Sequence, residues 1–225
     1  MPTEGAAAGR AELIGPGPPR AASREIAVDH WVHIGGTLLG AIGAASLLAT
    51  VASGADNGRL VPIIIYTFGL MAMLCCSALY NLAAEDKRAF LRRLDHAAIF
   101  LMIAGTYTPF TTRFGDDMWS LSVTVFVWAV ALAGAAAKLL APHYFERLSI
   151  LVYLALGWTA LAAFGRIQAT LDSTTIDLLV AGGATYSLGV VFYLWRGLRF
   201  HNAIWHLLVL AAAACHYTAV LRIAA

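Results

Sequence analysis

The chain is dominated by long apolar stretches that are separated by short polar ones. Seven of these stretches fit the length of a membrane helix, since roughly 20 residues are needed to cross about 30 Å of hydrocarbon. They cover residues 34–55, 60–84, 92–112, 118–137, 148–165, 178–195 and 202–221. A membrane-spanning segment must satisfy its own backbone hydrogen bonds, and the short alternating strands of a barrel are not visible here. The pattern therefore predicts helices.

The first 29 residues differ from the rest of the chain. They are rich in Ala, Gly, Pro and Arg, as in the segment GPGPPR at 15–20, and they lack the apolar core of a signal peptide. We therefore predict a disordered tail over residues 1–29 and a membrane domain over residues 30–225.

Composition supports a membrane protein. Hydrophobic residues make up 60% of the chain and charged residues 12%, whereas soluble domains average about 25% charged residues. Mean hydropathy is +0.73. We predict an all-α integral membrane protein, a seven-helix bundle whose partners are membrane lipids. A net charge of +2 without a long basic run argues against nucleic-acid binding. The small-residue segment GGTLLG at 35–40 leaves the oligomeric state open, because it suits internal helix contacts as well as dimers.

Positively charged residues predict the orientation, because Lys and Arg favour the cytoplasmic side of a membrane. Eleven of the 15 lie on the side of the N-terminal tail and four on the other side. The eleven are Arg10, Arg20, Arg24, Lys87, Arg88, Arg92, Arg93, Lys138, Arg147, Arg196 and Arg199, and the four are Arg59, Arg113, Arg166 and Arg222. This bias predicts a cytoplasmic N-terminus and a C-terminus outside.

Polar residues within the predicted spans lie at one depth, near the cytoplasmic ends. Such residues are costly inside a membrane and indicate a functional site by default. They are His33 at the first span, Ser77 and Asn81 in the second, Asp95 and His96 in the third, and Asn202 and His206 in the seventh. Ser77 and Asn81 are four residues apart, as are Asn202 and His206, so each pair shares one helix face.

Four segments of the chain resemble the hemolysin III proteins, the bacterial branch of the progestin and adiponectin receptor family. These segments are CSALYNL (76–82), RRLDHAAIFLMIAGTYTPF (92–110), GGATYSLGVVFY (182–193) and HNAIWHLLVLAAAACHYTAV (201–220). The family is similar to the alkaline ceramidases. The resemblance covers residues 30–222, and it implies a seven-helix protein of the bacterial inner (plasma) membrane with a cytoplasmic N-terminus.

The resemblance also implies a site. The family has a Ser and a His four residues apart in the second span, an Asp in the third, and His-x-x-x-His in the seventh. Its three His residues bind zinc, and a zinc-bound water is placed to attack a lipid amide. Carried over by position, Ser77 and Asp95 match the supporting residues and are candidate catalytic groups. His206 matches the second His of the seventh span and is a candidate metal ligand.

Two positions depart from the family pattern. Asn81 and Asn202 stand where the other two His ligands belong, and an amide oxygen replaces imidazole poorly on zinc. One interpretation is a loss of the metal, with hydrogen bonds among Asn81, Asn202 and Asp95 in its place. The other is a rearranged zinc site, in which His33, His96 and His206 supply nitrogen atoms and Asp95 supplies an oxygen atom.

Three functions are consistent with these residues. The first is a metal-dependent intramembrane hydrolase acting on a lipid amide, which the presence of Ser77, Asp95 and His206 favours. The second is a non-enzymatic protein that binds a lipid or maintains the state of the membrane. The third is a pore-forming cytolysin, which seven resident apolar spans favour least. The sequence alone does not decide whether the chain is an enzyme.

Overall fold

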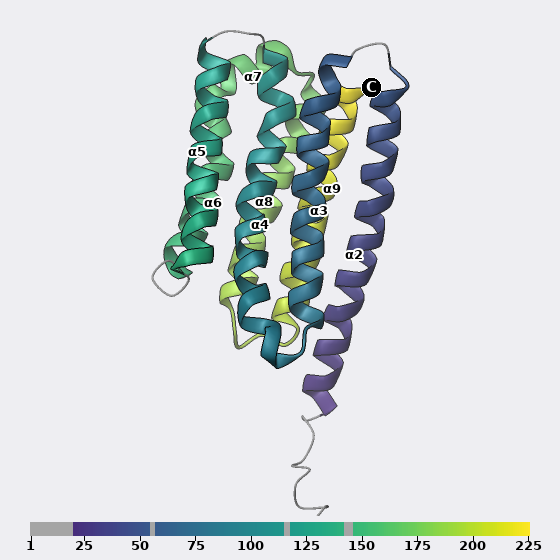
Figure 1. Cartoon of the computed structure of the whole chain (residues 1–225), viewed down its shortest axis with the longest axis vertical. Helices are drawn as coiled ribbons and strands as arrows, with labels where there is room; N and C mark the ends of the chain where they lie inside the picture. Colours follow the sequence, from purple (N-terminus) through teal and green to yellow (C-terminus); the bar gives the residue numbers. More distant parts are fainter. Residues whose placement is uncertain (1–19, 55–56, 115–117, 142–145) are drawn as a thin grey trace, which may run out of the picture.

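The chain folds into a bundle of helices. A computed structural model describes residues 20–54, 57–114, 118–141 and 146–225, and within these ranges it contains helices and turns but no strand (Figure 1). The α-helices are α2 (Arg20–Ala52), α3 (Leu60–Leu82), α4 (Glu85–Thr111), α5 (Met118–Leu140), α6 (Glu146–Trp158), α7 (Phe164–Thr170), α8 (Ser173–Leu194) and α9 (His201–Ala224). Short 3-10 segments are η1 (Asn57–Arg59), η2 (Thr112–Phe114) and η3 (Thr159–Ala163).

Several of these helices are long and apolar enough to cross a membrane. Within the described ranges α2, α3, α5, α8 and α9 qualify, and α6 and α7 together form a sixth candidate that is bent by 60°. Helix α4 does not reach the required hydropathy, because its apolar part begins at Asp95 and His96 and ends in a segment rich in Thr. Many large apolar side chains face outward: Leu39, for example, is 72% exposed. These helices fit a multi-pass membrane protein, and every predicted span contains a helix.

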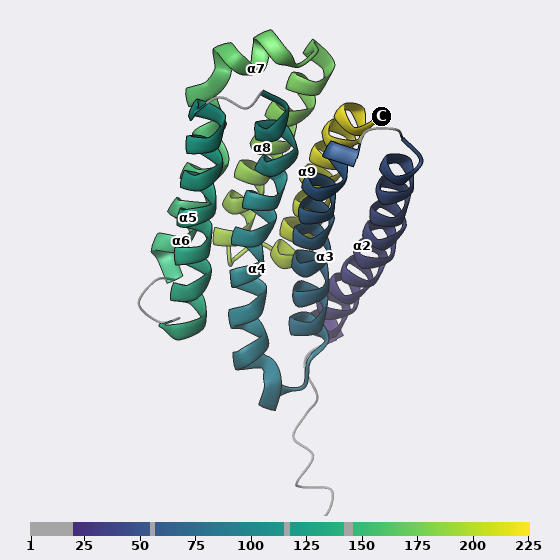
Figure 2. The same ribbon diagram turned by 45° about the horizontal axis from the view of Figure 1, so that its top comes forward.

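The order of helices around the bundle positions the site. Helix α2 packs against α3 and α9, α4 packs against α3 and α5, and α8 packs against α9. Helix α7 lies across one end of the bundle, and the C-terminus is at that same end (Figures 1 and 2). The first turns of α2 and of α9 lie at the opposite end, where α3 passes into α4 (Figure 1). The N-terminal segments of α2 and α9 are therefore neighbours.

The start of α2 corrects the predicted boundary of the tail. Residues 1–19 lie outside the described part of the chain, but the helix already begins at Arg20. Residues 20–29 contain neither Gly nor Pro, and Ala, Arg and Glu in this segment favour a helix. The last ten residues of the predicted tail therefore extend the first membrane helix, and Asp29 lies on that helix.

Glycine allows α3 and α4 to approach closely. A Cβ atom on Gly69 of α3 would lie 2.9 Å from the carbonyl oxygen of Leu101 in α4. A Cβ atom on Gly105 of α4 would lie 3.1 Å from the carbonyl oxygen of Ile65. Both contacts are with backbone, which cannot move aside as a flexible side chain can. This close crossing fixes α3, which carries Ser77, against α4, which carries Asp95.

Replacing Gly69 with alanine is expected to destabilise the fold by about 1–3 kcal/mol, the usual cost of overpacking a tight interior contact. Thermal unfolding of the purified protein in detergent measures this change. Gly35→Ala is the matched control, because a Cβ atom there meets nothing within 4 Å. Equal melting temperatures for the two variants would show that the α3–α4 crossing tolerates a methyl group.

Arginine side chains hold the other end of the bundle together. Arg59 and Arg113 donate hydrogen bonds to the carbonyl oxygens of Ala224 and Ile223, at 3.2 and 2.9 Å. Positive charge at the C-terminal end of a helix is favourable, and these bonds satisfy carbonyls that have no partner within α9. Nearby, Asp172 caps α8, and a hydrogen bond from the Thr175 hydroxyl, helped by Arg222, lowers the pKa of Asp172 to about 2.

Candidate functional site

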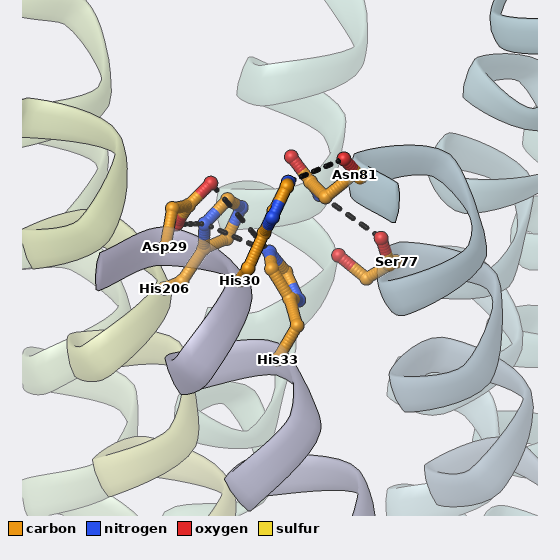
Figure 3. Close-up of polar contacts among 6 residues, drawn as sticks. All are labelled: Asp29, His30, His33, Ser77, Asn81 and His206. Atoms are coloured by element: carbon orange, nitrogen blue, oxygen red, sulfur yellow. Dashed lines mark hydrogen bonds and ion pairs between the residues drawn. The ribbon is translucent and has the colours of Figure 1, made fainter. Parts of the chain in front are cut away.

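Helices α2 and α9 bring one carboxylate and two imidazoles together at the end of the bundle where both helices begin. Asp29 and His33 are four residues apart on α2, so they share one helix face. His206 faces them from α9 (Figure 3). Their side chains are well shielded, with exposed fractions of 12%, 7% and 16% for Asp29, His33 and His206. Gly36 supports this packing, since a Cβ atom there would lie 2.6 Å from Leu210 of α9.

The polar atoms of these three residues lie close together. His206 Nδ1 lies 2.6 Å from Asp29 Oδ1 and 3.2 Å from His33 Nε2. His33 Nε2 lies 3.8 Å from Asp29 Oδ2. The two imidazole rings meet edge to face, with centroids 4.2 Å apart and an interplanar angle of 62°. The three candidate ligand atoms thus form a compact triangle, all within 4.8 Å of one another.

This triangle has more lone pairs than protons. An ionised carboxylate only accepts hydrogen bonds, so His206 Nδ1–H is the donor in the short contact with Asp29. The same N–H is then the only proton that faces the lone pair of His33 Nε2 when that nitrogen is unprotonated. One proton is shared by two acceptors. A bound cation would satisfy all three groups at once, so the donor set fits a metal ion.

The type and spacing of the donors suit zinc. Zinc bonds of about 2.0–2.1 Å at tetrahedral angles hold ligand atoms about 3.3 Å apart. The 3.2 and 3.8 Å separations from His33 bracket this value, whereas the 2.6 Å between His206 Nδ1 and Asp29 Oδ1 is a hydrogen-bond distance that a bound zinc ion would lengthen. Two His residues and one carboxylate are also the ligand set of several catalytic zinc sites, in which the fourth position is open to water or substrate. Asp29, His33 and His206 would therefore hold the ion.

Ser77 of α3 lies on a small cavity beside this triangle. The cavity has a volume of about 30 Å³, and His33, Ser77 and His206 contribute to its lining. Its other walls are mostly apolar, including Met73 and Leu210. The volume is enough for at least one water molecule and too small for a lipid tail. A water placed here would reach both imidazoles and the Ser77 hydroxyl.

Asp95 supports Ser77 from the neighbouring helix. Its carboxylate is a hydrogen-bond partner of the Ser77 side chain, and it interacts electrostatically with His206. Asp95 does not line the 30 Å³ cavity, and it is not one of the three grouped donors. The structure therefore places Asp95 beside Ser77, and Asp29, not Asp95, is grouped with His33 and His206.

Asn81 directs its side chain back to its own helix. The side-chain amide donates a 2.9 Å hydrogen bond to the carbonyl oxygen of Ser77, one turn earlier in α3. The backbone carbonyl of Asn81 lies 3.1 Å from His30 Nε2 of α2 (Figure 3). Asn81 therefore ties α2 to α3 through its backbone carbonyl, and its side chain is bonded within α3.

The remaining predicted residues lie around the triangle. Asn202 is exposed at the start of α9, where it lines a second cavity. His96 lies outside the grouped donors, and its backbone carbonyl accepts a 2.8 Å hydrogen bond from the Tyr153 hydroxyl. Of the three imidazoles in the rearranged-site interpretation, the structure thus brings His33 and His206 together and leaves His96 apart.

Asp29 is the residue that sequence reasoning missed. Asp29 is the last residue of the predicted tail, although the segment DHWVH at 29–33 has an Asp and a His four residues apart. This is the spacing that places two ligands on one face of a helix, and it is the same as that of Asn202 and His206. The i, i+4 pattern at the start of the first span was the available signal.

Comparisons with known proteins agree on one family. A family model described as Haemolysin-III related matches residues 23–217, a range that includes all three grouped donors. The chain is 34% identical to the Hemolysin-3 homolog of Bacillus subtilis (strain 168) over 180 residues, or 78% of this chain and 84% of that protein. It is 41% identical to Hemolysin-3 of Bacillus cereus over 130 residues, or 57% and 58% of the two chains. It is 28% identical to the human Monocyte to macrophage differentiation factor over 165 residues, or 69% and 67%.

Proposed function

The chain belongs to the Haemolysin-III related family, and on this premise we propose that it hydrolyses an amide bond of a membrane lipid. The observation that carries the proposal is the triangle of Asp29, His33 and His206 beside Ser77. We place the protein in the bacterial inner membrane, with seven crossings and a cytoplasmic N-terminus, because the Lys and Arg bias favours this orientation. The site then lies near the cytoplasmic face.

The triangle supplies the ligands that the family positions in α3 and α9 have lost. Asn81 and Asn202 remove two imidazoles, and Asp29 and His33 of α2 provide a carboxylate and an imidazole close to the retained His206. A zinc ion held there supplies Lewis-acid chemistry, which polarises a carbonyl and brings the pKa of water close to about 7. The proposed ligands therefore lie on α2 and α9, whereas the family pattern places its ligands on α3 and α9.

The chain's own residues orient the reactants. Ser77 lines the cavity beside His33 and His206, so its hydroxyl is placed to hold a water or the amide group by a hydrogen bond. Asp95 accepts a hydrogen bond from the Ser77 hydroxyl and so leaves the Ser77 lone pairs free for that water. The apolar walls, among them Met73 and Leu210, keep bulk water away from the site, which strengthens these polar interactions. Ser77 is the candidate catalytic group, and Asp95 is a positioning residue.

Hydrolysis of a lipid amide by the purified protein tests the proposal. Full-length protein in lipid nanodiscs is incubated with a fluorescent N-acyl lipid, and released fatty acid is measured with and without a zinc chelator. We expect turnover that the chelator removes and added zinc restores. Zinc-loaded, folded protein that releases no fatty acid would contradict the proposal and would favour a non-enzymatic lipid-binding role.

A further inference from the structure

The first turns of α4 are highly charged. Residues 85–94 read EDKRAFLRRL, and six of these ten side chains carry a charge. Such a segment does not enter hydrocarbon, where charged side chains are costly. Helix α4 has 27 residues and is therefore about 40 Å long, which exceeds the roughly 30 Å of a hydrocarbon core. Its first turns thus lie in the headgroup layer, at the end of the bundle where α3 passes into α4 (Figure 1).

The positive charges at the start of α4 are not explained by the helix itself. The N-terminus of a helix carries partial positive charge, which favours acids and disfavours bases. Glu85 and Asp86 follow this rule, whereas Lys87 and Arg88 oppose it within the same turn. The Lys and Arg bias accounts for the side of the membrane on which these bases lie, but not for their place on the helix. Their benefit therefore comes from a group outside α4.

Two of the cations in this segment have no protein partner. Lys87 and Arg93 form no ion pair and no side-chain hydrogen bond with any residue that the structure describes. Arg199, by contrast, pairs with Glu25 at 3.4 Å. Lys87 is exposed and Arg93 is half-buried. A half-buried guanidinium without a partner favours a phosphate, because its planar fork matches the phosphate oxygens.

Phe90 lies between these two cations on one face of α4. Lys87 and Arg93 are three residues before and after it, so each is about 60° from Phe90 around the helix axis. The Phe90 side chain is 61% exposed. An exposed ring is unfavourable in water but contacts the upper acyl chains at a membrane interface. Asp86 shares this side of the helix, so the face combines an apolar contact with a net positive charge.

We infer that the face formed by Lys87, Phe90 and Arg93 binds an anionic phospholipid of the adjoining leaflet. The lipid phosphate accepts hydrogen bonds from the Lys87 ammonium and the Arg93 guanidinium, and an acyl chain packs against Phe90. A lipid with a net negative charge is complementary to this face, whereas a zwitterionic lipid brings a cation of its own. The face is separate from the triangle, so lipid binding here requires neither zinc nor hydrolysis.

Native mass spectrometry of the full-length protein in detergent tests lipid binding at this face. Dioleoyl phosphatidylglycerol and dioleoyl phosphatidylcholine are titrated separately, and the affinity of the first bound lipid is measured for each. We expect phosphatidylglycerol to bind at least about tenfold more tightly. The double variant Lys87→Gln/Arg93→Gln should weaken phosphatidylglycerol binding about 25-fold, because each basic residue near an anionic lipid surface contributes about fivefold.

The matched control is Arg88→Gln/Arg196→Gln, which removes the same charge from the same end of the bundle. Arg88 lies about 160° from Phe90 around α4, and Arg196 follows α8. Both are exposed, and this variant should bind phosphatidylglycerol as the wild type does. Phe90→Ser keeps both cations and removes the ring. It should weaken phosphatidylglycerol binding about fivefold, the effect of losing about 40 Å² of apolar contact.

Two results would overturn the inference. One is equal affinity of the wild type for the two lipids. The other is an equal loss of phosphatidylglycerol binding in Lys87→Gln/Arg93→Gln and in the control, because only a diffuse attraction to positive charge predicts it. If Lys87→Gln/Arg93→Gln does not fold, the lipid comparison and Phe90→Ser still decide. Glycerol phosphate, which has the charge but no acyl chain, should not displace the lipid, and displacement would indicate a site for free phosphate instead.

Discussion

Replacing His33 with alanine is expected to lower zinc affinity more than about 100-fold. Even groups that only support a ligand cost 10–100-fold when they are removed, and His33 would be a direct ligand. Its Nε2 atom lies 3.2 Å from His206 Nδ1, and without it the group keeps one imidazole and one carboxylate. Zinc titration against a chromogenic chelator measures the affinity of the purified protein.

Neighbouring histidines provide the controls for this experiment. His96 lies outside the triangle, and His30 contacts the backbone of Asn81. His96→Ala and His30→Ala are expected to bind zinc as the wild type does. Loss of zinc in His96→Ala as well as in His33→Ala would instead point to the arrangement of His33, His96, His206 and Asp95 that the sequence suggested.

Replacing Asp95 with asparagine should have the second large effect, on turnover rather than on zinc. The variant keeps the shape of the side chain but loses the carboxylate that accepts the hydrogen bond from the Ser77 hydroxyl. Groups that position or transfer a proton in the transition state typically contribute 10²–10⁴-fold, so we expect kcat to fall by about 100-fold. Fatty-acid release and zinc content are measured on the same preparation.

Asp86→Asn is the matched control for Asp95→Asn. Asp86 is an exposed acid in the first turn of the same helix. It should leave both turnover and zinc content unchanged. If Asp95→Asn lost zinc together with activity, Asp95 would act as a ligand and the assignment of Asp29 to that position would be wrong.

The sequence was sufficient to predict an all-α fold with membrane-length helices and the family. Long apolar runs require helices in a membrane, so each predicted span contains a helix, and the resemblance to the hemolysin III proteins is confirmed by the family match. The described helices support five membrane-length spans, or six with the bent pair. The fifth predicted span, residues 148–165, reads as one apolar run, but the chain turns by 60° between α6 and α7. Hydropathy contains no information about such a bend.

The site was only partly predictable. His206 and Ser77 lie at positions fixed by the family pattern, and depth alone placed His33 near them. Asp29 was missed because the Pro- and Gly-rich segment before it suggested a tail, whereas the helix begins at Arg20. Whether Asn81 replaces a ligand or forms a tether depended on its rotamer, which bonds to its own helix. A sequence pattern does not determine rotamers or contacts between distant helices.

The zinc content of the protein as purified tests the central claim most directly. Full-length protein is extracted in detergent and its metals are counted by elemental mass spectrometry, beside a His206→Ala variant prepared in the same way. The proposed site predicts about one zinc per chain in the wild type and none in the variant, since His206 provides the atom that joins the triangle. A wild type that contains no zinc and takes none up on titration would contradict the metal site.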